Sequence, residues 1–598
     1  MGRCELDKLQ QKYGELHSLL CGYDQEERYI ELIHKAMQEI IDGLPKGSKV
    51  GFRPCGAPTT WLIQNFDFSH VNITGIFDKD ANHGDSSGIP VYDADSDETR
   101  NVDVFIATSF NWHNEIIAEM EKQHCGVLDI YHELEKKEVC LCASPETYIK
   151  GTHTILHDYL MKWKKADVSE KETALKNLLT AACEAKDFYM LNALCEENKE
   201  EYFFCRACQH KYNELYGLIK KLVAEREQKD VIWYWVDAVP YKWKNYFEGL
   251  CHLSKEGVHF CQAYTATPFT FQSFRTCFSG VLPLDDCEKC LEKLGYETSD
   301  LIQYLINNDY AICRMGARSS MWEEECIQED FLLDMPEANI SCNTILWNML
   351  CRLILLDQPA FLIAHLVVET HAPVNCAEHE KLENVYLSED REAQFAVSAK
   401  YVDKRVLWYS DLLRRGRRIQ IFMSDHGEHI TQKNSDIFWT QQKLHACCFA
   451  IGEGIQPRQE DHIFSYTKFI EFIRWLIEPE KYEYEECLTD YAVFQDTDFY
   501  SEELINRYIK RGKAEQALAY RGALDGKFKY VINSMGREFF YKIAGEEDVE
   551  INREENINAF ERLKRLAGTY FPNLLLFERF QYISRIYDAI NGSPYVKK

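Results

Sequence analysis

The chain has 598 residues, 46% of them apolar, which is enough for several hydrophobic cores and roughly three to five domains. Its 96 acidic and 68 basic side chains give a formal net charge of −28, which argues against nucleic-acid binding as the main function. The 23 cysteines lack the spacing of a disulfide framework and no signal peptide is evident, so we expect reduced thiols in a cytoplasmic protein. The most apolar stretch, from Thr344 to Val368, contains Arg352, Asp357 and Pro359, so no membrane span is predicted.

The first 150 residues predict a helical segment, residues 1–45, and then a small α/β domain, residues 46–150. Strands alternate with helix starts in the second part, which favours a parallel sheet. Residues 49–63 are expected to contain a strand, a Gly/Pro turn and a helix start, and further strands are expected at 72–78, 88–92 and 103–109. This part resembles Rossmann-like nucleotide-binding modules, although Gly51 and Gly56 do not complete a GxGxxG motif. The resemblance implies that Asp78 contacts the ribose of a nucleotide. The alternative is that Asp78 only caps the end of its strand.

Residues 151–229 predict polar helices with Leu and Ala at helical spacing, which is typical of a connecting or dimerising unit. The chain could therefore form an oligomer, and the sequence leaves its oligomeric state open. Cys205 and Cys208 form a lone CxxC, which we interpret as a packing pair within a helix, with a redox or metal role as the alternative.

Residues 230–485 predict a larger α/β domain, and residues 486–598 a smaller C-terminal subdomain. We expect buried strands at 231–237, 360–369 and 419–425, a strand and loop over 257–267, and helices from about Lys242, from Thr270 and over 391–414. The basic run Leu412–Arg418 is expected to be a solvated connecting turn. The C-terminal part shows short strands at 526–532 and 538–543 and a helix at 557–569.

Acidic and imidazole side chains fall at the ends of three expected strands: Asp237, His371 and the pair Asp425-His426. The carboxyl edge of a parallel sheet is where α/β proteins bind ligands, and oxygen with nitrogen donors suits a divalent ion such as zinc or manganese. Thr270 stands at a helix start, where a hydroxyl serves as an N-cap or as a nucleophile. A strand followed by a polar turn remains the alternative for Asp425-His426-Gly427.

Several stretches in this order resemble the alkaline phosphatase superfamily, in its sulfatase and phosphoethanolamine/phosphoglycerol transferase branch. They are Asp237, Phe278-Ser-Gly-Val-Leu-Pro283, His365-Leu-Val-Val-Glu-Thr-His371-Ala-Pro373 with Tyr401 to Asp411, Ser424-Asp-His-Gly-Glu428, and a sulfatase-like tail with Arg521, Lys529-Tyr530 and Gly536–Tyr541. The resemblance implies a large alkaline-phosphatase-like sheet flanked by helices. It also implies that Asp237, Thr270, Asp425 and His426 bind a divalent metal, that Thr270 is the nucleophile, and that His371 contacts a phosphoryl oxygen or protonates the leaving group.

The chain departs from sulfatases at the nucleophile. They carry a C/S-x-P-x-R motif that is oxidised to formylglycine, whereas Thr270-Phe-Gln-Ser-Phe274 has neither the cysteine nor the proline. Manganese or zinc is the favoured ion, with magnesium or calcium as alternatives. A second metal stays open, because the remaining candidates show no convincing spacing: Glu369, His429, His445 and His462.

The resulting hypothesis is a metal-dependent phosphotransferase or phosphodiesterase that acts on a phosphorylated head group through a phospho-threonine intermediate. The expected partner is a small phosphorylated or nucleotide-linked substrate, with a polysaccharide or sugar hydroxyl as one acceptor. A phosphomonoesterase or sulfatase-like hydrolase is the alternative enzyme. A non-catalytic scaffold that retains the fold is the alternative from another class.

Overall fold

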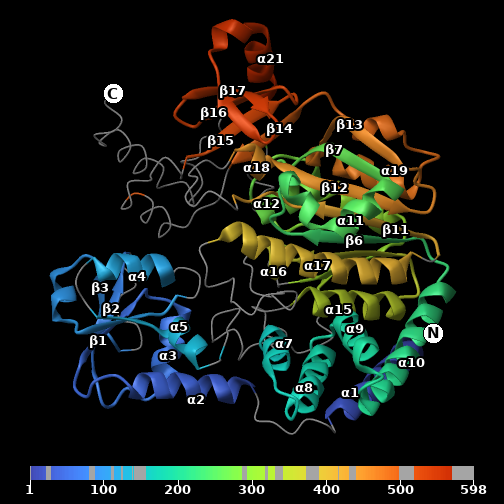
Figure 1. Cartoon of the computed structure of the whole chain (residues 1–598). Coiled ribbons are helices and arrows are strands. Elements are labelled where there is room, and N and C mark those ends of the chain that lie inside the picture. Colours follow the sequence, from blue (N-terminus) through green and yellow to red (C-terminus); the bar gives the residue numbers. More distant parts are fainter. Residues whose placement is uncertain are drawn as a thin grey trace.

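The computed structural model describes residues 2–21, 29–79, 88–109, 113–122, 126–137, 139, 156–283, 285, 292–316, 321–329, 341–371, 390–414, 416–429, 439–496, 509 and 518–568. Three sheets organise this part of the chain (Figure 1). Among the described residues, no helix combines the length and the apolarity that crossing a bilayer requires.

The first sheet is parallel and has the strand order β3-β2-β1-β4-β5. Its apolar strands are buried between helices, and the N-terminal helix α2 (Tyr29–Asp42) shares their core. The elements are β1 (Lys49–Arg53), α3 (Ala57–Asn65), β2 (Asn72–Asp78), β3 (Val91–Asp93), η2 (Asp97–Asn101), β4 (Val104–Ala107), α4 (His113–Glu121), β5 (Gly126–Asp129) and α5 (Ile130–Lys136). The expected alternation of strands and helices is thus present, and it forms a separate unit in Figure 1.

The second sheet is central and has the order β13-β7-β12-β11-β6-β10-β8-β9. Strands β11, β6, β10 and β8 are mutually parallel, while β12 runs antiparallel to β11 and β7. The strands are β6 (Asp230–Val236), β7 (Val258–Tyr264), β8 (Ala311–Met315), β9 (Gln328–Glu329), β10 (Ala360–Leu366), β11 (Arg418–Ser424), β12 (His445–Gly452) and β13 (Arg458–Ser465). The expected large α/β sheet flanked by helices is confirmed.

Helices cover both faces of this sheet, because its strands are apolar on both sides. One face packs against α12 (Thr270–Ser279), α14 (Asp300–Asn307) and α19 (Phe469–Ile477). The other face shares a continuous core with α1 (Gly2–Cys21), α7 (Leu156–Lys165), α8 (Lys171–Glu184), α9 (Phe188–Asn198), α10 (Phe203–Glu225), α11 (Glu248–Leu253), α15 (Cys342–Leu355) and α17 (Arg391–Leu413). Cys205 and Cys208 are both buried within α10.

The third sheet is antiparallel, in the order β14-β15-β16-β17-β18, and one helix covers it. In Figure 1 this sheet lies at the top of the view, above the central sheet. Its elements are β14 (Ala492–Asp496), β15 (Tyr520–Leu524), β16 (Phe528–Asn533), β17 (Glu538–Ala544), β18 (Glu547–Glu550) and α21 (Ile557–Ala567).

Three local expectations were wrong. The strand expected over 360–369 ends at Leu366 and is followed by the short helix α16 (Val368–His371). The helix expected near Lys242 is a 3₁₀ turn, η4 (Tyr241–Tyr246), and then α11. The basic run 412–418 is not a solvated turn throughout, because Arg418 is 2% exposed, donates to Val223 O at 2.7 Å and lies 3.4 Å from Asp230.

Candidate metal and nucleophile site

The candidate site lies at the carboxyl ends of three neighbouring strands, β11, β6 and β10. Asp425 directly follows β11, and Asp237 directly follows β6, whose last residue pairs with Ser424. Because side chains alternate along a strand, Asp237, Asp425 and His365 of β10 continue the series that faces α12. This alternation brings three residues that lie far apart in the sequence to one point on the α12 side of the sheet.

The backbone around Asp425 holds one carboxylate oxygen and leaves the other available. Asp425 Oδ1 accepts hydrogen bonds from Ala238 N at 2.9 Å and His426 N at 2.7 Å. Ala238 adopts a left-handed conformation, φ 59°, which is strained for a residue with a β-carbon and is typical of functional sites. Among the described residues, the buried Asp425 Oδ2 accepts no hydrogen bond.

His426 turns an unprotonated nitrogen toward the two carboxylates. Its Nδ1 lies 2.8 Å from Gly427 O, and a carbonyl only accepts, so in the neutral ring the hydrogen belongs to Nδ1 and Nε2 keeps its lone pair. Gly427 is needed for this turn, because a β-carbon there would lie 1.7 Å from Gln442 O. Ser424 Oγ donates to His426 O at 2.7 Å and further fixes the segment.

Thr270 is the first residue of α12 and brings a half-buried hydroxyl to the same point. Its Oγ1 lies 3.2 Å from Asp237 Oδ2 and 3.3 Å from His426 Nε2. Both neighbours are acceptors, so the single hydroxyl hydrogen serves one of them at a time. Ser273, one turn further along α12, donates to Asp425 O at 2.8 Å and ties the helix to the β11 end.

The donor set fits a divalent cation. One ligand atom from each of Asp237, Asp425 and His426 lies within 4.8 Å of the others, and all three residues are buried. Burial, and then the nearby Asp237 carboxylate, raise the pKa of Asp425. Two carboxylates buried together without a cation are costly, whereas two oxygens and an imidazole nitrogen are a common zinc or manganese environment.

His365 is a neighbour whose role the sequence analysis missed. Its Nδ1 accepts from Arg314 Nη2 at 2.8 Å, so the neutral ring carries its hydrogen on Nε2, which lies 3.4 Å from Asp237 Oδ2. Burial lowers the pKa of His365, which favours this neutral form. His365 therefore donates to Asp237 and orients it rather than coordinating a metal itself. The sequence feature that could have revealed this role is the presence of a histidine, on the side that faces α12, in an otherwise apolar strand.

Among the other expected participants, those with described side chains have their partners outside this cluster. His371 is the last residue of α16, and its side chain lies outside the described residues. Glu369 is buried and accepts from Cys342 N at 2.8 Å. The described histidines proposed for a second metal have partners elsewhere: His429 at Thr440, His445 at Glu546 and His462 at Glu460.

Comparison with known proteins gives structural matches only. A protein in the alkaline phosphatase superfamily from Vibrio parahaemolyticus is 14% identical, covers 61% of this chain and 95% of its own, and has a TM-score of 0.41. A putative sulfatase from Bacteroides thetaiotaomicron is 14% identical, with 62% and 97% covered and a TM-score of 0.42. A phosphonate monoester hydrolase from Silicibacter pomeroyi is 10% identical, with 62% and 96% covered and a TM-score of 0.42.

No protein-family model matches the chain, and no curated protein sequence matches it. The three structures are named as an alkaline phosphatase superfamily protein, a putative sulfatase and a phosphonate monoester hydrolase. At these identities the likeness concerns the fold alone.

Proposed function

We propose that the chain is a metal-dependent phosphoryl-transfer enzyme, a phosphotransferase or phosphodiesterase, with Thr270 as its nucleophile. One observation carries this proposal: the Thr270 hydroxyl lies 3.2 and 3.3 Å from two buried metal-type donors, Asp237 and His426. A helix cap needs no such neighbours, and a scaffold gains nothing from burying two carboxylates beside a hydroxyl.

Asp237, Asp425 and His426 would hold one divalent ion. When bound, this ion would supply Lewis-acid stabilisation of negative charge and lower the pKa of a nearby hydroxyl. The oxygen-rich set with one imidazole favours manganese or zinc and admits magnesium.

The chain's own groups define the chemistry of the first step. Asp237 Oδ2 lies 3.2 Å from Thr270 Oγ1 and would draw the hydroxyl proton as Oγ1 attacks phosphorus, whereas the Nε2 lone pair of His426 would hold the ion. The new Oγ1–P bond forms while the bond from phosphorus to the leaving oxygen breaks, and the leaving oxygen takes up a proton. The free N–H groups in the first turn of α12 favour the phosphoryl anion there.

A second step would release the group from Thr270. Attack by water gives hydrolysis, and attack by a sugar or other alcohol gives transfer. The substrate class that fits is a phosphorylated polar head group. The neighbouring phosphonate monoester hydrolase, by its name, supports a substrate of this kind. A formylglycine sulfatase mechanism is not proposed, because position 270 is a threonine.

The test is to trap the intermediate. Metal-reconstituted protein is mixed with a phosphodiester, quenched in acid and digested, and Thr270 is examined by mass spectrometry for added phosphate. We expect phosphorylation at Thr270 and about 10⁴-fold slower turnover in Thr270→Ala, as for the loss of other nucleophiles. Thr74→Ala, a half-buried threonine of β2, is the matched control with unchanged turnover. Full activity in Thr270→Ala would refute the proposal.

A further inference from the structure

We propose a second divalent-metal site, formed by His113, Asp129 and His132 at the carboxyl edge of the first sheet. One ligand atom from each residue lies within 4.8 Å of the others. This site is independent of the function proposed for the central sheet.

Sheet topology explains how the three residues meet. Strands β4 and β5 are parallel neighbours, and Ala107, the last residue of β4, pairs with Asp129, the last residue of β5. The chain leaving β4 starts α4 at His113, and the chain leaving β5 starts α5, which carries His132. Both segments therefore begin at the same edge, where open α/β sheets bind their ligands.

The start of α5 links two of the three residues to each other. Asp129 Oδ1 caps α5 by accepting from Tyr131 N at 3.1 Å and His132 N at 3.2 Å, while Oδ2 is hydrogen-bonded to His132 Nδ1. A helix cap with a nearby histidine needs nothing more. His113 comes from another helix, is 2% exposed, and places its ring 5.7 Å from that of His132.

The chemistry of the set indicates a borderline ion such as Zn²⁺. Two imidazoles and one carboxylate are typical zinc ligands, whereas calcium and magnesium prefer oxygen. Zinc bonds of about 2.0–2.1 Å place tetrahedral ligand atoms about 3.3 Å apart, so modest side-chain rotations suffice. The side chain of His132 is 47% exposed and that of Asp129 19%, which leaves the fourth position open to water or another ligand.

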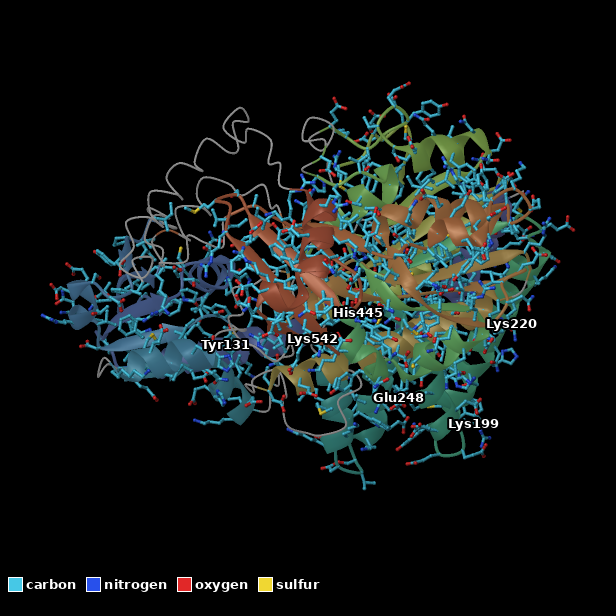
Figure 2. All side chains as sticks on the ribbon, turned by 90° about the horizontal axis from the view of Figure 1, so that it is seen from above. Tyr131, Lys199, Lys220, Glu248, His445 and Lys542 are labelled. Carbon is cyan, nitrogen blue, oxygen red and sulfur yellow. The ribbon has the colours of Figure 1, made fainter. Side chains whose placement is uncertain are left out.

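The two candidate sites lie on different sheets and share no residue. Tyr131, whose ring lies 5.5 Å from that of His113, is labelled in Figure 2 within the first α/β unit. Metal bound at one site can therefore be removed by substitution without altering the other.

The experiment measures zinc binding to the full chain whose central cluster carries Asp237→Asn and Asp425→Asn. Zinc per chain is determined after equilibrium dialysis, and affinity by competition with a chromophoric chelator. We expect one bound zinc in this background. Removing a residue that only orients a metal ligand typically weakens metal binding up to about 100-fold. His132→Ala removes a ligand itself, so it should reduce zinc affinity about 100-fold or more. His210→Ala, at a 72% exposed side chain of α10, is the control and should retain full affinity.

His132→Ala decides the question because this residue is half exposed, so the substitution leaves the core intact. His113→Gln should weaken binding to a similar extent. Co²⁺ in place of zinc should give a visible absorption band that both substitutions remove. If the double variant does not fold, wild-type stoichiometry serves instead, and His132→Ala should lower it by one.

Two results would overturn the site. One is zinc affinity that His132→Ala leaves unchanged. The other is zinc that is lost with His17→Ala, which would assign the metal to the separate cluster of His17, Cys21 and Glu184.

Discussion

The first and second sheets gather metal-type side chains at equivalent edges, yet the two clusters differ in what surrounds them. At the central sheet the donors are buried, are mostly carboxylate oxygens, and have a hydroxyl 3.2 Å from Asp237 Oδ2. At the first sheet they are mostly imidazole, partly exposed, and all three come from the helices α4 and α5 or the strand end between them. Topology thus brings candidate ligands together in both places, while the nucleophilic chemistry that we propose for the central edge uses its burial and the hydroxyl at the adjacent helix start.

The largest expected difference separates Asp425→Asn from Asp129→Asn. The first substitution removes a buried charge from the proposed metal set and should reduce turnover about 10³-fold with loss of metal from the central site. The second keeps a side chain that caps α5 well and should leave turnover within about twofold. Phosphodiester turnover and metal content are measured for both variants. An equal loss of turnover in the two variants would contradict the proposal that the cluster at the central sheet, and not the one at the first sheet, serves catalysis.

His365 tests whether the central cluster depends on a neighbour that orients it. Removing its hydrogen bond to Asp237 in His365→Ala should cost about 10- to 100-fold in metal affinity or turnover. His365→Gln places an N–H near the original Nε2 and should recover part of the loss. Metal affinity and the separate values of kcat and KM are the measurements. A merely structural residue would show no rescue by glutamine.

Gly427 tests how tightly the turn that presents His426 is packed. A β-carbon would meet Gln442 O at 1.7 Å, so Gly427→Ala should lower the free energy of unfolding by about 1–3 kcal/mol. Gly217→Ala is the control in the exposed middle of α10, with nothing within 4 Å, and should stabilise by about 0.5–1 kcal/mol. Urea unfolding compares them, and an unaffected Gly427→Ala protein would show that the turn is loose.

The smallest effect concerns His259 of β7, on the central sheet but outside the cluster. Burial, with a further contribution from Lys244, lowers the pKa of His259 to about 4. The unfolded chain takes up this proton near pH 6.5, so stability is lost as pH falls from about 6.5 to about 4.

His259→Gln removes that loss. Relative to wild type it should gain about 1 kcal/mol between pH 7 and pH 4.5, a value reduced for partial exposure. Urea unfolding at the two pH values measures it, and a pH-independent difference would contradict it.

Particular elements show how far sequence reasoning reached. The expected strand over 72–78 matches β2, and the helix expected from Thr270 matches α12, because apolar runs and turn residues signal such elements locally. The strand over 360–369 was predicted too long, since Val368 continues the apolar run although the chain already turns there. Arg418 was expected in solvent, because the sequence does not show that its strand partner is the buried Asp230.

The sequence by itself determined the α/β class, the alternation of strands and helices, and the residue types available for metal chemistry, since these depend on periodicity and on the order of motifs along the chain. Only the tertiary structure decided which of these residues meet. The strand order β11-β6-β10 and the side-chain parity of those strands place Asp425, Asp237 and His365 together, and the packing of α12 adds Thr270. Strand order is set by long-range packing, which no local pattern encodes.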